Sequence, residues 1–409
     1  MEVLYPRCAG LDVHLGSVVA SVRLHHEVRP QCVVKTFGTT TKELLALAEW
    51  LTEHGVTHVA MEATGIYWKP VWHLLDGSFE LVLANAAHIK NVPGRKTDAN
   101  DAAWIAELLA HGLIRASFVP PTSIQELRML LRTRKQLVRE RTQHVQRLQK
   151  VLEDANLKIA SAVSDILGTS GRAILQALIA GETRPEELLD LTTGRLRANR
   201  QTLLESLRGR VGPHHRFLLG LHLGQIDALD RALKAVDTEV GSHLDPFRAQ
   251  VAHLITMPGI SDLAAQTIVS EIGIDMGRFP SAGHLLSWAG LCPRNDESAG
   301  KRRSTRLRQG APWLKPLLTQ AAWGAARTKN CYLRAQFLRI KSRRGPKKAI
   351  MAVAASMLTS AYYMLRDDID YQDLGHDYFD RLDRAKTAGR HVKRLEALGY
   401  LVEIKEAAV

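Results

Sequence analysis

The segment between Thr122 and Leu167 contains neither glycine nor proline, and this restricts the possible folds more than any other feature. Apolar residues recur in it every seven positions on two seams: Leu131, Val138, Val145 and Leu152, and Leu127, Leu148 and Ala155. Arg134 and Arg141 interrupt the second seam. The pattern predicts one long helix with coiled-coil character, imperfect enough to form a helical arm rather than an extended zipper.

The length of the chain, 409 residues, exceeds what one ordinary hydrophobic core supports, so two or three domains are expected. We place them at residues 1–120, 121–245 and 246–409. Residues 196–240 form a second polar, leucine-spaced stretch that predicts more helix. A helical spacer and a surface for nucleic acid or a second subunit are both compatible with the middle domain.

The charge of the chain is unevenly distributed. The formal net charge is +13, and the isoelectric point is about 9.7, which favours a polyanionic partner. Residues 1–120 carry 10 Lys/Arg against 12 Asp/Glu, residues 121–240 carry 19 against 14, and residues 241–409 carry 26 against 16. A slightly acidic first domain followed by basic regions is the distribution expected if the first domain holds an acidic site and the later regions contact a polyanionic partner.

The four cysteines form no CxxC pair, which argues against a zinc ribbon or a disulfide framework and fits a reducing cytoplasm. No signal peptide is recognisable at the first residues, and no membrane association is expected. The apolar residues 349–365 approach the length of a membrane span, but they contain Ser and Tyr and follow a basic run. We interpret them as a buried helix.

The first 120 residues alternate between strand and helix patterns. Residues 8–24 predict a β-hairpin and residues 32–38 a third strand. Helices and strands are then expected in alternation, at residues 40–55, 57–64, 65–77, 79–86 and 98–112. Three opening strands followed by this alternation describe an α/β layer like that of ribonuclease H, with an all-α remainder after it.

Four carboxylates in this domain could share one site. Asp98 and Asp101 lie three apart at the start of a predicted helix and therefore on one face. Asp12 and Glu62 end predicted strands, where sites in α/β sheets assemble. Such an oxygen-only cage suits Mg²⁺ or Mn²⁺, and two ions about 4 Å apart support phosphodiester chemistry. Taken singly, these aspartates have ordinary explanations as a helix cap, a first-turn acid and a turn residue.

A basic loop near residues 290–310 places Ser298 in a small-residue turn beside several cations: Lys301, Arg302, Arg303 and Arg306. A serine there could be a nucleophile whose neighbouring cations hold a phosphate, with Ser304 as a rival. Because no general base is visible nearby, composition alone favours a solvated loop that grips phosphate. A second basic run contributes four more cations: Arg343, Arg344, Lys347 and Lys348.

Residues 254–272 have the form of a helix-hairpin-helix, with the turn Pro-Gly-Ile-Ser before a small-residue helix. Gly259 permits a tight turn, and the following N–H groups could hold a DNA phosphate without reading a base. An ordinary turn between two helices is the alternative.

These segments, in this order, resemble the DEDD insertion-sequence transposases, also called Piv-invertase-like recombinases. The resemblance is carried by five motifs: GLDVH (10–14), AMEATG (60–65), KTDANDA (96–102), PGI (258–260) and GLCPRNDESAGKRRS (290–304). It implies a RuvC-like first domain whose acids Asp12, Glu62, Asp98 and Asp101 bind divalent metal. It also implies a C-terminal domain whose serine, Ser298 here, attacks a DNA phosphate.

The same resemblance implies a composite site built from two subunits, assembly as dimers and tetramers, and a noncoding bridge RNA that pairs with donor and target DNA. It places such a protein in the cytoplasm of a bacterium, associated with the nucleoid. The role of His14, two residues after the first acid, and of the tail after Asp367 are left open by it.

Three other functions compete with this interpretation. A RuvC-like Holliday-junction resolvase or DNA invertase would need the four acids but not Ser298 if water were its nucleophile. An ATPase of the actin–Hsp70 class shares an Asp followed by a glycine-containing hairpin, but it needs further glycine-rich loops that residues 150–300 do not supply convincingly. A catalytically inert DNA-binding protein would have no reason to cluster acids.

Overall fold

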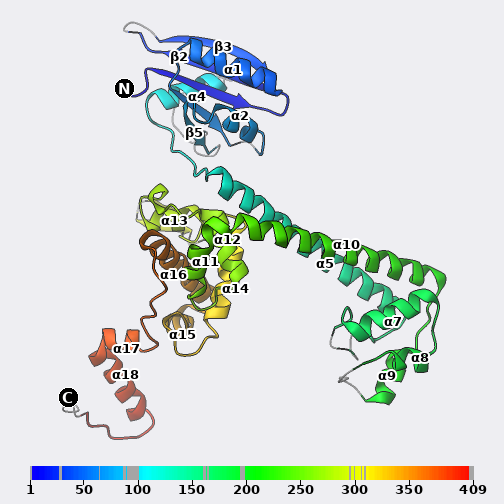
Figure 1. Ribbon diagram of the computed structural model, residues 1–409. Coiled ribbons are helices and arrows are strands. Elements are labelled where there is room, and N and C mark those ends of the chain that lie inside the picture. Colours follow the sequence, from blue (N-terminus) through cyan, green and yellow to red (C-terminus); the bar gives the residue numbers. More distant parts are fainter. Residues whose placement is uncertain are drawn as a thin grey trace. The chain divides into compact units, whose positions relative to one another are not determined.

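The computed structural model describes most of the chain (Figure 1). Its described residues are 2–26, 30–63, 65–85, 89, 101–159, 163, 165–193, 199–293, 296–298, 300–304, 306–307 and 310–404, with only the backbone at 296–298 and 302–304. They form two compact units, residues 1–119 and residues 120–409.

The first unit is built on a five-stranded mixed sheet of order β3-β2-β1-β4-β5. Its strands are β1 (Arg7–Val13), β2 (Ser17–Leu24), β3 (Gln31–Gly38), β4 (His58–Glu62) and β5 (Glu80–Ala84). The first three strands are antiparallel neighbours, whereas β4 runs parallel to β1 and β5 parallel to β4. The predicted hairpin, third strand and alternating pattern are therefore confirmed.

Helices cover both faces of this sheet. The side chains of Leu11, Val59 and Leu83 point to one face and pack with α1 (Thr41–Glu53) and α2 (Trp68–Leu75). On the other face, Cys8, Ala60 and Ala84 pack with the apolar side of α4 (Asp101–Ala110). Because alternate residues of a strand face opposite ways, β1, β4 and β5 each supply side chains to both cores.

The α4 helix approaches β1 at backbone distance. Gly10 makes this contact, because a Cβ atom there would lie 2.2 Å from the carbonyl oxygen of Ala102. Two residues earlier, the Cys8 thiol donates to the carbonyl oxygen of Ala106 at 3.5 Å, and burial raises the pKa of this thiol to about 11. Since Cys8 meets Ala106 and Gly10 also meets Ala102, α4 runs antiparallel to β1.

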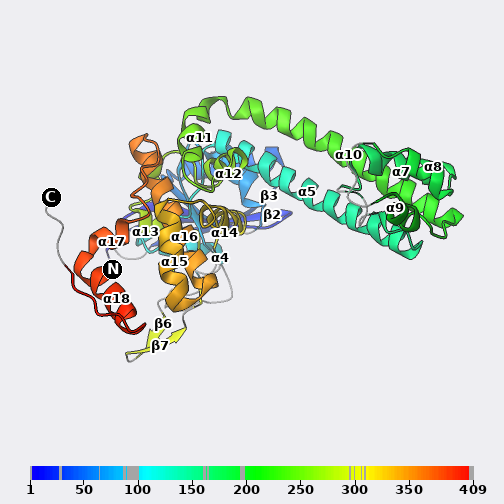
Figure 2. The same cartoon turned by 90° about the horizontal axis from the view of Figure 1, so that it is seen from below.

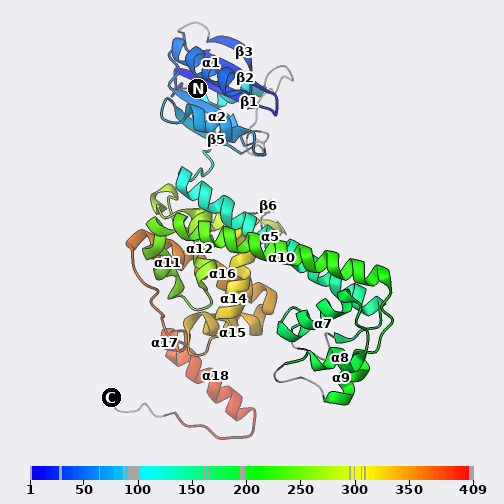
Figure 3. The same cartoon turned by 45° about the vertical axis from the view of Figure 1, so that its right-hand side comes forward.

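The second unit begins with an arm of two antiparallel helices, α5 (Thr122–Asp154) and α10 (Pro213–His243), which lie side by side (Figure 3). The two arginines that interrupt the heptad seam pair across this interface, Arg134 with Asp237 and Arg141 with Asp230. The seam therefore packs against another helix of the same chain.

The prediction of helix as far as Leu167 is wrong. The α5 helix ends at Asp154, and Asn156 takes a left-handed φ of 57°, which redirects the chain without glycine or proline. The helix expected within residues 196–240 is present as two separate helices, α9 (Arg200–Ser206) and α10. With α7 (Thr169–Ala180) and α8 (Pro185–Asp190), these segments enclose a leucine-rich core at the end of the arm.

Helices make up most of the rest of this unit: α11 (Arg248–Ile255), α12 (Asp262–Ile272), α13 (Ala282–Trp288), α14 (Leu314–Ala325), α15 (Tyr332–Arg344), α16 (Pro346–Asp367), α17 (Tyr378–Leu382) and α18 (Arg384–Glu396). Among the described residues, α16 is the one helix long and apolar enough to cross a membrane. Its buried side chains, which include Val353, Met357 and Leu358, pack among α11, α13, α14 and α15, so the predicted buried helix is confirmed.

A buried ion pair joins the arm to these helices. The Glu271 carboxylate on α12 is 2% exposed and accepts two hydrogen bonds from the Arg132 guanidinium, each of 2.8 Å. Arg128 lies beside it and donates to the backbone carbonyls of Ser270 and Glu271, and burial lowers the pKa of Arg128 to about 10. Glu271 is thus the counter-charge for Arg128, whose side chain is 17% exposed, and for Arg132, whose side chain is 38% exposed.

We predict that Gly10→Ala destabilises the first unit by about 2 kcal/mol or more, because the new methyl group would push α4 away from β1. Urea unfolding of the full chain would measure this. Gly16→Ala is the matched control, since nothing lies within 4 Å of a Cβ at that position, and its effect should stay within about 0.5 kcal/mol. Equal losses in the two variants would contradict the packing argument.

We also predict that Glu271→Gln costs about 3 kcal/mol or more, because it leaves buried arginine charge uncompensated. The comparison variant is Asp237→Asn, which breaks the Arg134 pair where the Asp237 side chain is 48% exposed. That change should cost less than about 1 kcal/mol. The same denaturation experiment reads both, and a Glu271→Gln loss no greater than that of Asp237→Asn would rule out a structural role for this ion pair.

Candidate active site

Two of the predicted acids lie at the same edge of the sheet. The parallel strands β1 and β4 are in register up to the pair Leu11 and Met61. Asp12 and Glu62 are the next residue on each strand, so they lie side by side, Asp12 as the last residue but one of β1 and Glu62 as the last residue of β4. The Asp12 side chain is 24% exposed, and Glu62 is half-buried, so both carboxylates reach solvent.

A third acid comes to this edge from a helix. Alternation along the strands places Asp12 on the face of Gly10, and Glu62 on the face of Ala60, which is the face that α4 covers. Because α4 runs antiparallel to β1, its first residue, Asp101, lies at the end of the helix where β1 finishes. Asp12, Glu62 and Asp101 therefore converge from three elements, whereas Asp98 lies outside the described residues.

The convergence is one of placement rather than of close contact. Within the described part of the chain, the group of three potential ligands whose donor atoms all lie within 4.8 Å is not this one but Asp154, His214 and His215.

His14 is the residue at this edge whose role sequence reasoning left open. Its Nε2 atom lies 3.1 Å from Oδ2 of Asp12, and its side chain is 58% exposed. The backbone N–H of His14 donates to the carbonyl oxygen of Ser17 at 2.9 Å, so the β1–β2 turn fixes the residue beside the acid. In the sequence, the spacing of two residues between Asp12 and His14 was the feature that could have indicated this contact.

The donor set fits a hard divalent cation. Asp12, Glu62 and Asp101 offer only carboxylate oxygens, which Mg²⁺ and Mn²⁺ prefer, and no cysteine lies among them. These three residues would hold the ion from one face of the sheet edge.

The group of Asp154, His214 and His215 is explained by hydrogen bonds that join two helices. The His215 ring accepts the Gly212 N–H at Nδ1, at 3.0 Å, and Nε2 lies 2.9 Å from the Asp154 carboxylate. Both nitrogens of a buried ring are thus engaged in tying the start of α10 to the end of α5. A metal ion would have to displace at least one of these bonds.

Ser298 lies in a short two-stranded ribbon of β6 (Asp296–Ser298) and β7 (Lys301–Ser304), which projects from the helices in Figure 2. Ser298 pairs with Lys301 next to the turn, where Gly300 takes a φ of 73°, and Ser304 pairs with Asp296 at the other end. The side chains of Ser298, Ser304 and the predicted phosphate ligands lie outside the described residues, apart from two exposed cations: Lys301 and Arg306.

The second basic run forms a corner between two helices. Arg343 and Arg344 end α15, and Lys347 and Lys348 begin α16. All four are exposed, and no acid of the described residues lies within ion-pair distance of any of them. Such a corner can contact a polyanion without giving up existing ion pairs.

The Pro-Gly-Ile-Ser turn joins α11 to α12, and Gly259 has a packing role in it. Its φ is 87°, and a Cβ atom there would lie 2.3 Å from the carbonyl oxygen of Ala321 on α14. Ser261 caps α12 by accepting the N–H of Ala264 at 3.3 Å. The glycine is thus required by contact with α14, independently of any phosphate.

Comparison with known proteins is consistent with this arrangement. Residues 9–157 match a DEDD transposase domain of the IS110 type, and residues 251–338 match the transposase family IS116/IS110/IS902. The first match spans the three acids at the sheet edge, and the second spans the ribbon that carries Ser298.

Several relatives are similar over most of their length. The 42 kDa protein of insertion element IS900 from Mycobacterium paratuberculosis is 25% identical over 71% of this chain and 80% of its own. A mini-circle protein of Streptomyces coelicolor, named as the transposase for IS117, is 26% identical over 62% and 69%. A Sinorhizobium fredii protein named as a transposase is 23% identical over 77% and 74%.

Two matches that cover the sheet edge and the ribbon in the family's order, together with relatives named for insertion elements, lead to one conclusion. The chain belongs to the IS110/IS116/IS902 family of insertion-sequence transposases.

Proposed function

We propose that this transposase cuts and rejoins DNA strands by covalent catalysis, with a RuvC-like first domain whose acids hold divalent metal and with Ser298 as the nucleophile. The observation that carries the proposal is the placement of Asp12, Glu62 and Asp101 at one edge of the sheet. Asp98, three residues before Asp101, is the fourth acid of the proposed set.

The carboxylates of these acids form the metal-binding site at which the phosphate reacts. A bound Mg²⁺ or Mn²⁺ would supply charge stabilisation for the oxygens of the reacting phosphate. His14 touches Asp12 and orients its carboxylate, and the half-buried Glu62 narrows access to the same spot. Gly10 lets α4 pack closely on β1 at Ala102, and Asp101 is the preceding residue of the helix.

The serine provides the covalent step. Its Oγ attacks the phosphorus of a DNA phosphodiester, a P–Oγ bond forms, and the bond from phosphorus to one deoxyribose oxygen breaks, so the number of phosphate ester bonds is unchanged. The hydroxyl proton leaves Ser298, and the departing deoxyribose oxygen takes up a proton. Rejoining reverses these steps and needs no ATP. Lys301, opposite Ser298 in the ribbon, is suited to hold the attacked phosphate.

The remaining parts of the proposal rest on family resemblance. They are a site completed by a second subunit, assembly as dimers and tetramers, and guidance by a noncoding RNA from the element. The net charge of +13 is compatible with DNA and RNA partners together. A RuvC-like resolvase or invertase that uses water as its nucleophile is the alternative, and it would retain the acids but make no use of Ser298.

We predict that Ser298→Ala abolishes the covalent protein–DNA adduct, because no oxygen remains at that position to form the bond. Denaturing gel electrophoresis with labelled element-end DNA would detect the adduct, and a binding assay should show that DNA is retained. Ser304→Ala is the matched control and should keep the adduct. The reverse pattern would assign the nucleophile to Ser304, and adducts in both variants would contradict a serine of this ribbon.

We predict that Asp12→Asn weakens Mn²⁺ binding by at least about tenfold, because a neutral amide replaces a charged ligand. Titration calorimetry on the full-length protein without DNA measures this separately from catalysis. The control is Glu80→Gln, an exposed acid that begins β5 at the opposite edge of the sheet. Unchanged Mn²⁺ affinity in Asp12→Asn would exclude a metal site at this edge.

A further inference from the structure

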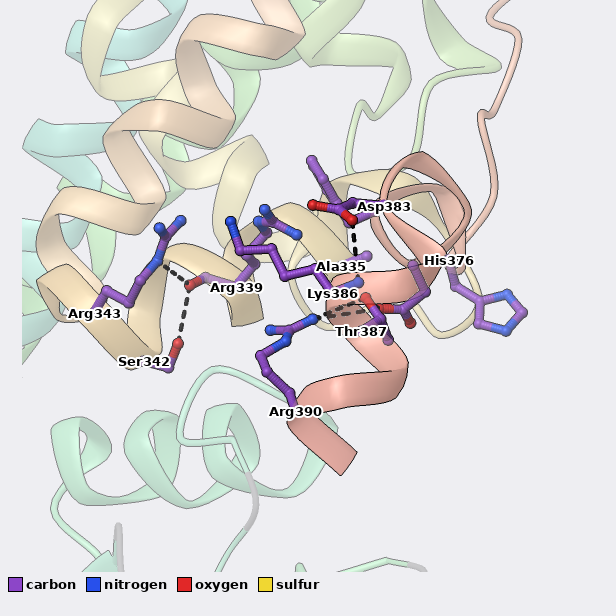
Figure 4. A pocket seen from close by; sticks show the side chains of 11 residues that line it. Ala335, Arg339, Ser342, Arg343, His376, Asp383, Lys386, Thr387 and Arg390 are labelled. Atoms are coloured by element: carbon purple, nitrogen blue, oxygen red, sulfur yellow. Dashed lines mark hydrogen bonds and ion pairs between the residues drawn. The ribbon is translucent and has the colours of Figure 1, made fainter. Parts of the chain in front are cut away.

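The tail after α16 folds back onto α15 and encloses a pocket of about 520 Å³. The pocket lies between α15 on one side and α17 and α18 on the other (Figure 4). Nothing in the proposed chemistry uses this region, and the family match ends at Leu338, before the tail. Its lining is dominated by charged side chains.

Aromatic contacts fix the tail in place. The Tyr332 ring at the start of α15 stacks on Phe379 with ring centroids 5.2 Å apart, and Tyr378 meets the same ring edge-on. The Arg339 guanidinium lies over the other aromatic partner, Phe379, at 4.9 Å. These contacts bury apolar surface that α17 could not cover alone, so α17 docks on α15.

Hydrogen bonds also attach the segment between α16 and α17 to the preceding helices. The Tyr332 N–H donates to the Asp373 carboxylate at 3.0 Å, and the Tyr371 N–H donates to the Thr256 hydroxyl at 2.9 Å. The Tyr371 side chain is half-buried, and burial raises the pKa of its phenol. Asp370 pairs with His253 at 2.7 Å. The tail is thus attached at several points to α11 and α15.

Four cations then face one cavity. Arg339 and Arg343 lie one turn apart on α15, and Lys386 and Arg390 lie one turn apart on α18. Figure 4 shows Arg339 and Lys386 extending toward one another from the two helices. Like charges brought together in this way repel unless an anion joins them.

The acids of the pocket are already engaged. Asp380 lies 4.0 Å from the Arg390 guanidinium, and Asp383 caps α18 by accepting the Lys386 N–H at 3.1 Å. In the part of the chain that is described, no acid lies within ion-pair distance of Arg339, Arg343 or Lys386. Three cations therefore remain available to an outside anion.

We propose that this pocket binds the phosphodiester backbone of a nucleic acid. Its cations form two rows, and the α15 row continues through Arg343 into the exposed corner of Arg344, Lys347 and Lys348. A row of that kind fits the repeating charge of a strand better than one isolated phosphate. The Phe379 ring is covered by Tyr332 and Arg339, so this ring is not offered to a base. The proposed contact is made by the cations to the phosphates and is therefore independent of sequence.

The test uses the full-length protein and two probes of unrelated sequence, a labelled DNA duplex and a labelled RNA duplex, titrated over a series of salt concentrations. In Arg343→Ala/Lys386→Ala, the slope of log affinity against log salt should fall by about 2, or about 1 for each cation removed. Arg384→Ala is the matched control, because it removes the same charge from α18 at a residue that does not line the pocket. Its slope should stay unchanged.

A variant that makes the pocket more positive distinguishes an effect of charge on binding from an effect of folding. Asp383→Asn keeps a side chain that can cap α18 but removes a negative charge from the pocket, so binding should tighten. A pocket that merely stabilises the tail would show no such gain. All substituted side chains are exposed, and circular dichroism melting should be the same as for the unaltered chain.

The two probes identify the backbone. A reduced slope on DNA alone assigns the pocket to DNA, on RNA alone to the guide, and on both to either backbone. Slopes that match the Arg384→Ala control on both probes overturn the proposal. The readout is binding without strand cleavage, so it is independent of whether Ser298 is the nucleophile.

Discussion

The contact between Gly10 and the first turns of α4 is the constraint on which the candidate active site depends. A backbone-to-backbone approach leaves no room for a side chain and so fixes the distance between helix and sheet. It also fixes direction, because Cys8 meets Ala106 farther along α4. The helix must therefore begin where β1 finishes, and Asp101 reaches the edge that Asp12 occupies. Packing of α4 against β1 thus places Asp101 at the edge of the sheet where Asp12 lies.

Local pattern was sufficient to predict the strands and helices of the first unit, since each is short, is bounded by turn residues and has its own period. Which strands pair with one another was harder to predict from the sequence. That Asp12 and Glu62 end strands could be predicted, but their adjacency depends on β1 and β4 being parallel neighbours in register, which no local pattern encodes. The side of the sheet that α4 covers could likewise not be predicted from local sequence pattern. Asp98 lies outside the described residues.

The arm shows the opposite kind of error. The heptad pattern predicts α5, but the absence of glycine and proline predicts a helix as far as Leu167, whereas α5 ends at Asp154 and Asn156 follows it in a left-handed conformation. Arg134 and Arg141 looked like defects in the seam because their partners lie about 90 to 100 residues later, on α10. A charged residue in a heptad can be a defect or half of a cross-helix ion pair, and only the partner helix decides which.

The proposed nucleophile and the acids differ in how rigidly they are held. Asp12 and Glu62 stand on a sheet that contributes to two buried cores, and Asp101 begins a helix that packs into one of them. Ser298 stands beside the turn of a two-stranded ribbon, and an isolated ribbon of that size is marginally stable in water. If Ser298 is the nucleophile, the ordering of this ribbon against DNA or a second subunit becomes part of the reaction. Cleavage would then be confined to the assembled complex, because an unassembled chain would hold its metal ligands in place but not its attacking oxygen.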